Sequence, residues 1–161
     1  MFSSMQKITP FLWYDNQLEE AMNSYISIFK NSKILNVNRL PGESPGSAGN
    51  VITATFELEG QTFYGLNGGP SFKFTEAISF FVDCKTQEEV DDLWERLSEG
   101  GSKSQCGWLK DKFGISWQIV PSILGELMGS KDPVKAQSVM QAMMKMTKLD
   151  IALLQEAYDN A

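Results

Sequence analysis

The stretch Ala77-Ile-Ser-Phe-Phe-Val-Asp-Cys84 decides the fold, because the elements of one βαβββ-type unit follow it in order. Its aromatic and β-branched residues predict a strand. Thr86-Gln-Glu-Glu89 then matches a capping box, in which a hydroxyl and a carboxylate satisfy backbone N–H groups at the start of a helix. We expect this helix to run through Leu97 and to end at Gly100-Gly101, where glycine adopts left-handed backbone without strain.

Two further strands complete this unit. Aromatic and alternating residues predict them around Ser104–Leu109 and over Ile115–Val120, with the turn Lys110–Gly114 between them. The sequence leaves open one additional short strand. The unit matters because the other half of the chain repeats it.

The first half of the chain shows the same order of elements without obvious sequence identity. The expected elements are a strand over Lys7–Tyr14 with Pro10 at an edge or bulge position, a helix over Gln17–Phe29, and strands over Ile34–Leu40, Val51–Leu58 and Gln61–Leu66. Pro41–Gly49 is a loop by its glycine, proline and serine content. We therefore expect one domain over residues 1–161, with modules at 7–69 and 76–121 around a cavity.

The remaining residues, 122–161, predict a helical extension. The expected helices are Ser122–Met128, Val134–Met146 with Pro133 in its first turn, and Leu149–Tyr158. This tail carries a methionine cluster made up of Met140, Met143, Met144 and Met146. Such a cluster can form an adaptable binding surface, but we favour helices that pack on the sheet or on a second subunit.

Composition excludes several classes of function. The chain of 161 residues has a net charge of −6 and no basic stripe, which argues against a nucleic-acid partner. No apolar run approaches the roughly 20 residues of a membrane span, and Met1–Met5 does not resemble a signal peptide. Cys84 and Cys106 lack a metal-binding or disulfide spacing. We interpret them as free thiols and expect a cytoplasmic protein.

The absence of histidine excludes most common catalytic sites. Ser-His-Asp and Cys-His catalysis both need an imidazole, which is also the commonest metal ligand. The acidic pairs at Glu19-Glu20, Glu88-Glu89 and Asp91-Asp92 fit solvated helix faces. The glycines at 65, 68 and 69 do not form a phosphate-binding loop, because no helix is expected after them.

Strand alternation separates a dry face from a mixed face in the second module. Ile78, Phe80 and Val82 share the face expected to meet the helix, as do Trp117 and Ile119. The opposite face carries Ala77, Ser79, Phe81 and Asp83 on one strand and Ser116, Gln118 and Val120 on the other. A mixed face on a curved sheet is typical of a hollow that holds a small molecule.

Several of these stretches resemble the PhnB-like proteins of the vicinal oxygen chelate superfamily, which also contains the glyoxalases, bleomycin-resistance proteins and extradiol dioxygenases. The resemblance rests on Asn67–Pro70, Ala77–Cys84, Glu89–Trp94 and Cys106–Pro121, and it extends from Ile8 to Tyr158. It implies an α+β fold in which paired βαβββ modules form a curved, mostly antiparallel sheet, usually in a homodimer. Many members carry the label "3-demethylubiquinone-9 3-methyltransferase".

Enzymes of this superfamily hold a divalent metal with His and Glu from four strands. By the resemblance, Gln118 stands at the position of a Glu ligand and Ala77 at the position of a His ligand. The other two positions fall near Ile8 or Thr9 and between Tyr64 and Asn67. These residues do not provide the charged or imidazole donors that such an ion requires. We therefore expect no metal and no cofactor.

Three functions follow as hypotheses. The first is a metal-free protein that binds or sequesters a small aromatic or amphipathic molecule, through Asn67, Ser79, Phe81, Trp108 and Gln118. Asn67 and Gln118 would be its polar anchors, although each could instead be a structural amide that joins adjacent strands.

The second hypothesis is an enzyme with chemistry that needs no metal. Cys106 would be the nucleophile, activated by Lys103 or Lys110, and Asp111 or Asp83 would be the base. Methyl transfer by a cofactor-binding enzyme of the doubly wound fold is disfavoured, because the sequence shows no glycine-rich strand-to-helix loop. The third hypothesis is an interaction module that uses the methionine-rich helices.

Overall fold

The computed structural model describes residues 6–42 and 48–161. The chain divides into two compact units, residues 1–73 and 74–161, which we call unit 1 and unit 2. Two expectations from the sequence lie outside the described residues, namely the character of Met1–Met5 and the middle of the Pro41–Gly49 loop.

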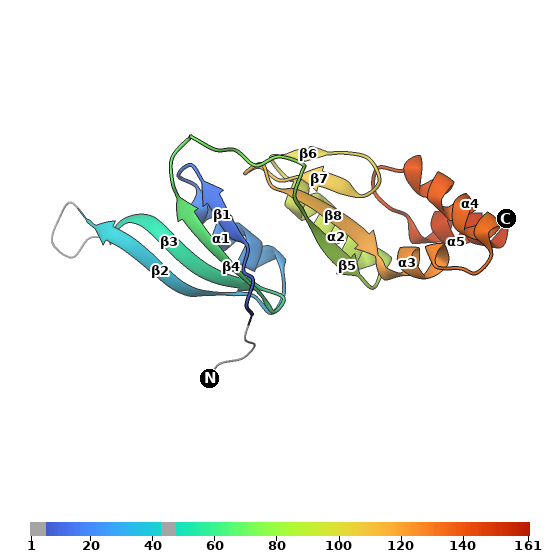
Figure 1. Ribbon diagram of the computed structural model, residues 1–161, viewed down its shortest axis with the longest axis horizontal. Helices are drawn as coiled ribbons and strands as arrows, with labels where there is room; N and C mark the ends of the chain where they lie inside the picture. The colour runs from blue at the N-terminus through green and yellow to red at the C-terminus, as the bar shows by residue number, and fades with distance from the viewer. Residues whose placement is uncertain (1–5, 43–47) are drawn as a thin grey trace. The chain divides into compact units, whose positions relative to one another are not determined.

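Unit 1 contains the first βαβββ module (Figure 1). Its elements are β1 (Phe11–Tyr14), α1 (Leu18–Ile28), β2 (Lys33–Pro41), β3 (Ala48–Leu58) and β4 (Gln61–Asn67). The strands form one sheet in the order β1-β4-β3-β2, in which β1 pairs with β4 in parallel and the other pairs are antiparallel. Pro10 directly precedes β1, a strand at the edge of this sheet, as the sequence predicts.

Unit 2 repeats this topology and adds the helical extension (Figure 1). Its elements are β5 (Ser79–Cys84), α2 (Gln87–Ser98), β6 (Ser102–Lys103), β7 (Trp108–Lys110), β8 (Ser116–Pro121), α3 (Ser122–Met128), α4 (Pro133–Met144) and α5 (Ile151–Asp159). The sheet order is β5-β8-β7-β6, again with the first and last strands of the module in parallel. The prediction of an α+β fold built from paired βαβββ modules is confirmed, and β6 is the additional short strand.

The capping box at the start of α2 forms as predicted. Thr86 is the N-cap residue, and its hydroxyl accepts a hydrogen bond from the backbone N–H of Glu89 at 3.1 Å. The Glu89 carboxylate accepts from the backbone N–H of Lys85 at 2.8 Å. The first bond satisfies a backbone donor that a helix leaves without a partner in its first turn, and the second holds the residue that precedes the N-cap.

Each module has one helix, and it packs on one face of the sheet. In unit 2, α2 packs on β5, β8 and β7. The side chains of Leu109, Trp117 and Ile119 are buried on this face. Phe80 also meets Trp117 there, with ring centroids 5.4 Å apart. Ile78 was expected on the same face, but it precedes β5 and is 74% exposed.

One predicted strand begins later than its sequence pattern indicates. Ser104–Leu109 was expected to be extended, but β7 starts at Trp108. Cys106 and Gly107 have φ values of 58° and 82°, in the left-handed region, so the chain turns at these residues instead of continuing a strand. The backbone N–H groups of Cys106 and Gly107 donate to the carbonyl oxygens of Met146 and Thr147, both at 2.8 Å.

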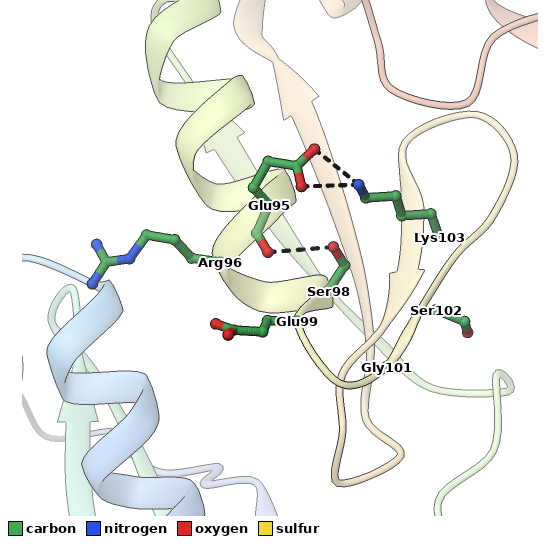
Figure 2. Close-up of a pocket in the computed structure, with 7 residues that line it drawn as sticks. All are labelled: Glu95, Arg96, Ser98, Glu99, Gly101, Ser102 and Lys103. Carbon is green, nitrogen blue, oxygen red and sulfur yellow. Dashed lines mark hydrogen bonds and ion pairs between the residues drawn. The ribbon is translucent and has the colours of Figure 1, made fainter.

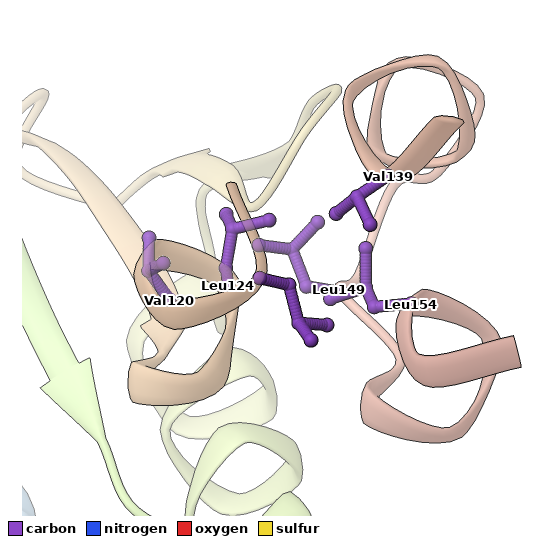
Figure 3. Packing of buried hydrophobic residues seen from close by; sticks show 6 residues of the cluster. Val120, Leu124, Val139, Leu149 and Leu154 are labelled. Atoms are coloured by element: carbon purple, nitrogen blue, oxygen red, sulfur yellow. The ribbon is translucent and has the colours of Figure 1, made fainter. Parts of the chain in front are cut away.

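The helical extension shares a core with the end of the second module. Figure 3 shows this cluster, which consists of Val120, Leu124, Leu127, Val139, Leu149 and Leu154. Gln87 on α2 also anchors the extension, because its side-chain amide donates to the Leu149 carbonyl and accepts from the Ile151 N–H. Among the described residues, none of the helices has the length and apolar character needed to cross a bilayer.

Leu149 provides a direct test of this packing. Its side chain is fully buried, so we expect Leu149→Ala to lower the free energy of unfolding by about 3 kcal/mol, the usual cost of a large-to-small change in a core. Leu153→Ala is the matched control, because Leu153 is 51% exposed and its truncation should change stability little. Urea unfolding measures both variants. Equal stabilities would contradict the structural role of the extension.

Candidate functional site

The face of the second sheet opposite α2 carries three of the predicted ligand-binding residues in one row. Phe81 on β5 pairs in register with Gln118 on β8, and Gln118 pairs with Trp108 on β7. Residues in register on adjacent strands project to the same side of a sheet. The row therefore consists of two aromatic rings with an amide between them.

Ser79 belongs to the same face. The Gln118 side-chain N–H donates to the Ser79 hydroxyl at 3.0 Å, a bond that holds the amide against the sheet. Its carbonyl oxygen can still accept a hydrogen bond from a ligand. Phe81 is 61% exposed, a high value for a ring in the middle of a strand. The structure thus brings together Ser79, Phe81, Trp108 and Gln118.

Unit 1 carries an equivalent row. The parallel strand pairs end at Tyr14–Asn67 in unit 1 and at Cys84–Pro121 in unit 2. When the two pairs are aligned at these ends, Phe11 occupies the position of Phe81, and Tyr64 occupies the position of Gln118. The rings of Phe11 and Tyr64 meet edge to face with centroids 5.7 Å apart, and they are 56% and 41% exposed. This pair was not among the residues predicted from the sequence, although the repeated module could have indicated it.

Asn67 lies in unit 1, and its side chain has a structural role. Its carbonyl oxygen accepts from the backbone N–H of Leu18 at 2.9 Å, at the start of α1. Its amide N–H donates to the Val51 carbonyl at 3.0 Å. Asn67 also lines a surface hollow of about 470 Å³ between the start of α1 and the strands β2 and β3. These two bonds correspond to the structural alternative that the sequence left open.

Cys106 lies at the turn before β7, and the two cations proposed to activate it have other partners. Lys103 forms an ion pair with Glu95 on α2 at 2.8 Å. Lys110 forms an ion pair with Glu76. A thiol becomes a good nucleophile when a nearby positive charge stabilises its thiolate. In the structure each of these lysines is instead paired with a glutamate carboxylate.

The two aspartates proposed as bases are both held in hydrogen bonds. Asp111 is buried and accepts from the backbone N–H groups of Phe113 and Ile115 and from the Trp117 indole N–H, at 2.9 to 3.0 Å. This carboxylate organises the turn between β7 and β8. The hydroxyl of Ser122 and then the ammonium of Lys85 hold the pKa of Asp83 below its usual value. A lowered pKa makes a carboxylate a weaker base.

The positions expected to bind a metal in this superfamily do not fit a divalent ion. Gln118 offers only a neutral amide oxygen, and the side chain of Ala77 has no donor atom. The counterpart of Gln118 in unit 1 is the phenol of Tyr64. Across residues 6–42 and 48–161, no group of three or more potential Cys, Asp or Glu ligands gathers in one place. We therefore assign no step of any reaction to a metal.

A second surface hollow, of about 500 Å³, lies beside the end of α2 and strand β6 (Figure 2). It is lined by Glu95, Arg96, Ser98, Glu99, Gly101, Ser102 and Lys103. Its charged groups largely bind one another or neighbours: Lys103 pairs with Glu95, and Arg96 pairs with Asp92 at 3.6 Å. None of the ligand-binding residues predicted from the sequence lines it.

Two features of the open face in unit 2 were not recognised from the sequence. Ser116 is buried, and its hydroxyl has no hydrogen-bond partner within the part of the chain that the structure describes. The ion pair between Lys110 and Glu76 lies in the same region, because Lys110 pairs in register with Ser116. Strand alternation indicated the face of Ser116, but the registration between strands was needed to find its neighbours.

A family model and a solved structure with the same description both match this chain. The family model described as 3-demethylubiquinone-9 3-methyltransferase matches residues 6–120. A solved structure titled putative 3-demethylubiquinone-9 3-methyltransferase, PhnB protein, from Bacillus cereus is 40% identical and has a TM-score of 0.66. The match covers 72% of this chain and 99% of that chain. No curated protein matches the chain.

Two other solved structures are more distant. Protein PA1353 from Pseudomonas aeruginosa is 21% identical, with a TM-score of 0.58, and the match covers 73% of this chain and 98% of that chain. The fosfomycin resistance protein FosX from Listeria monocytogenes, solved with Mn(II) and sulfate, is 14% identical with a TM-score of 0.47. That match covers 71% of this chain and 88% of that chain. The likeness to PA1353 supports the fold. The likeness to FosX is too low to carry any argument about this chain.

The two thiols should differ in reactivity. Burial raises the pKa of the Cys84 thiol to about 12, so Cys84 has almost no thiolate near neutral pH. Cys106 is partly exposed. We expect iodoacetamide at pH 8 to label the native protein at Cys106 alone, and to label both residues after unfolding in guanidinium. Peptide mass spectrometry measures the sites, with Cys106→Ser as the control. Labelling of native Cys84 at a similar rate would contradict its burial.

Proposed function

This chain belongs to the 3-demethylubiquinone-9 3-methyltransferase family, the PhnB-like proteins of the vicinal oxygen chelate superfamily, and on that premise we propose that it binds a small aromatic or amphipathic molecule without a metal. The observation that carries the proposal is the row Phe81–Gln118–Trp108 on the helix-free face of the second sheet. The binding partner of this face would be a small molecule with a planar apolar body.

The chemistry of the row favours such a ligand. Aromatic rings provide large apolar surfaces and prefer offset-stacked or edge-to-face contact with other rings. Gln118 places a hydrogen-bonding group between the two rings, so that a ligand can be oriented as well as held. Binding sites for small molecules typically combine an apolar lining with a few fixed polar groups. The bond from Gln118 to Ser79 fixes the amide before the ligand arrives.

The second row, Phe11–Tyr64, supports the same proposal for unit 1. Its rings are exposed on paired strands, where a sheet usually keeps polar residues if the face is solvated. Thr55 pairs in register with Tyr64 and adds a hydroxyl to the row. We propose one aromatic site per module, with a homodimer as the state implied by the family resemblance.

Methyl transfer, which the family description names, is the alternative. The sheets do not provide the strand order that a doubly wound cofactor site requires, because each has one parallel pair within otherwise antiparallel strands. The three groups considered for metal-free catalysis also have structural partners: Cys106 through its backbone, and Asp83 and Asp111 through their side chains. Binding is therefore the function that the geometry supports best.

Calorimetric titration with 2-naphthol tests this proposal. We expect saturable binding that Gln118→Leu weakens by about threefold to tenfold, the range for loss of one net hydrogen bond. Gln141→Leu is the matched control, because Gln141 is an exposed amide on α4 and its loss should leave the affinity unchanged. Absence of binding to 2-naphthol, or equal affinities for the Gln118→Leu and wild-type proteins, would overturn the site.

A further inference from the structure

A second row lies beside the aromatic row on the same face of unit 2, and it is polar. Ser79 on β5 pairs in register with Ser116 on β8, and Ser116 pairs with Lys110 on β7. Each of these residues is two positions along its strand from a member of the aromatic row. The two rows are thus about 7 Å apart, a separation that one bicyclic molecule can span.

Ser116 is the unusual member of this row. Its side chain is only 2% exposed, and its hydroxyl is without a hydrogen-bond partner among the described residues. A buried hydroxyl without a partner is destabilising, and such groups are rare in folded proteins. Ser79 and Lys110 flank Ser116 in register, so two hydroxyls and one ammonium are aligned across three strands. All three can donate hydrogen bonds.

Unit 1 differs at the matching positions, and the difference is informative. The same count from the ends of the parallel pairs makes Thr9 and Thr62 the counterparts of Ser79 and Ser116. Both counterparts therefore also carry a hydroxyl. The counterpart of Lys110 is Glu57, which pairs in register with Thr62, so the charge is reversed. Gln6, the counterpart of Glu76, donates to the Thr9 hydroxyl and the Thr62 carbonyl.

From this juxtaposition we infer that Ser79, Ser116 and Lys110 form an oxyanion subsite, specific to unit 2, for the carboxylate of an aromatic acid. The inference rests on the proposed function, because the aromatic row would hold the body of the same ligand. Lys110 supplies the charge, and the hydroxyl of Ser116 donates the hydrogen bond for which it has no acceptor among the described residues. Hydrogen bonds to a charged acceptor are stronger than neutral ones.

Glu76 acts as the competitor of the ligand. It pairs with Lys110 in the free protein, and both side chains are substantially exposed, at 63% and 40%. An exposed ion pair contributes little to stability, so Lys110 can exchange the Glu76 carboxylate for that of a ligand at small cost. Removing the charge of Glu76 should therefore strengthen the binding of an anion and leave a neutral aromatic molecule unaffected.

Two probes of nearly equal shape separate this subsite from the aromatic row, namely 2-naphthoate and the neutral 2-naphthylmethanol. We expect the wild-type protein to bind 2-naphthoate about tenfold more tightly, the gain expected of one charge-assisted hydrogen bond. Lys110→Met should remove this preference, Ser116→Ala should weaken 2-naphthoate alone, and Glu76→Gln should strengthen 2-naphthoate alone. Calorimetry measures each affinity, and thermal melting shows that each variant is folded.

Lys103→Met is the matched control, because Lys103 is also an ion-paired lysine on this sheet but binds Glu95 of α2. It should bind both probes as the wild type does. Equal affinity of the wild type for the two probes would overturn the subsite and leave the aromatic site standing. Absence of binding to either probe would overturn both. If Ser116→Ala fails to fold, the exposed positions Lys110 and Glu76 still decide the outcome.

Discussion

One helix on a four-stranded sheet covers only one of the two sheet faces. In both modules the last strand lies beside the first and parallel to it. The helix that follows the first strand packs on one face of the sheet. The large apolar side chains on that side form the core, including Phe56 in unit 1 and Trp117 in unit 2. The other side has no helix of its own module, so its composition is free to serve recognition instead of folding. The proposed binding site depends on this division of the two faces.

The repeat supplies two copies of the open face, and they have diverged in their side chains. Aromatic rings are kept at Phe11 and Phe81, which indicates a common apolar platform. Their neighbours differ, with Tyr64 in one module and Gln118 in the other. Glu57 in one module and Lys110 in the other reverse the charge of the adjoining row. A duplicated fold can thus present two sites of different selectivity.

Much of this architecture could be predicted, because its signals are local in the sequence. The capping box at Thr86, the alternation along β5 and β8, and the placement of Phe81 and Gln118 on one face depend on residues close together in the chain. The start of β7 could not be predicted in this way. The left-handed turn at Cys106 is fixed by hydrogen bonds that its backbone N–H groups donate to carbonyl oxygens of the distant segment at Met146. The tie between Gln87 and Leu149 likewise joins residues far apart in sequence.

In the candidate site, too, contacts between residues far apart in the sequence could not be predicted. Sequence reasoning treated Asp111 as a base, whereas its partners make it the organiser of a turn. The adjacency of Ser116 and Lys110 could not be predicted, because a residue type says nothing about its cross-strand neighbour until the register is known. Family resemblance identified the positions Ala77 and Gln118, and the contacts of Gln118 then explained why an amide suits that place.

The central claim is that side chains on the open sheet face recognise the ligand without a metal. Titration of the same protein sample with 2-naphthoate, once in EDTA, once with added Mn(II) and once with added Zn(II), tests it most directly. The account predicts the same affinity under all three conditions and no stoichiometric metal by elemental analysis of the purified protein. Binding that disappears in EDTA and returns with one metal ion per chain would contradict it.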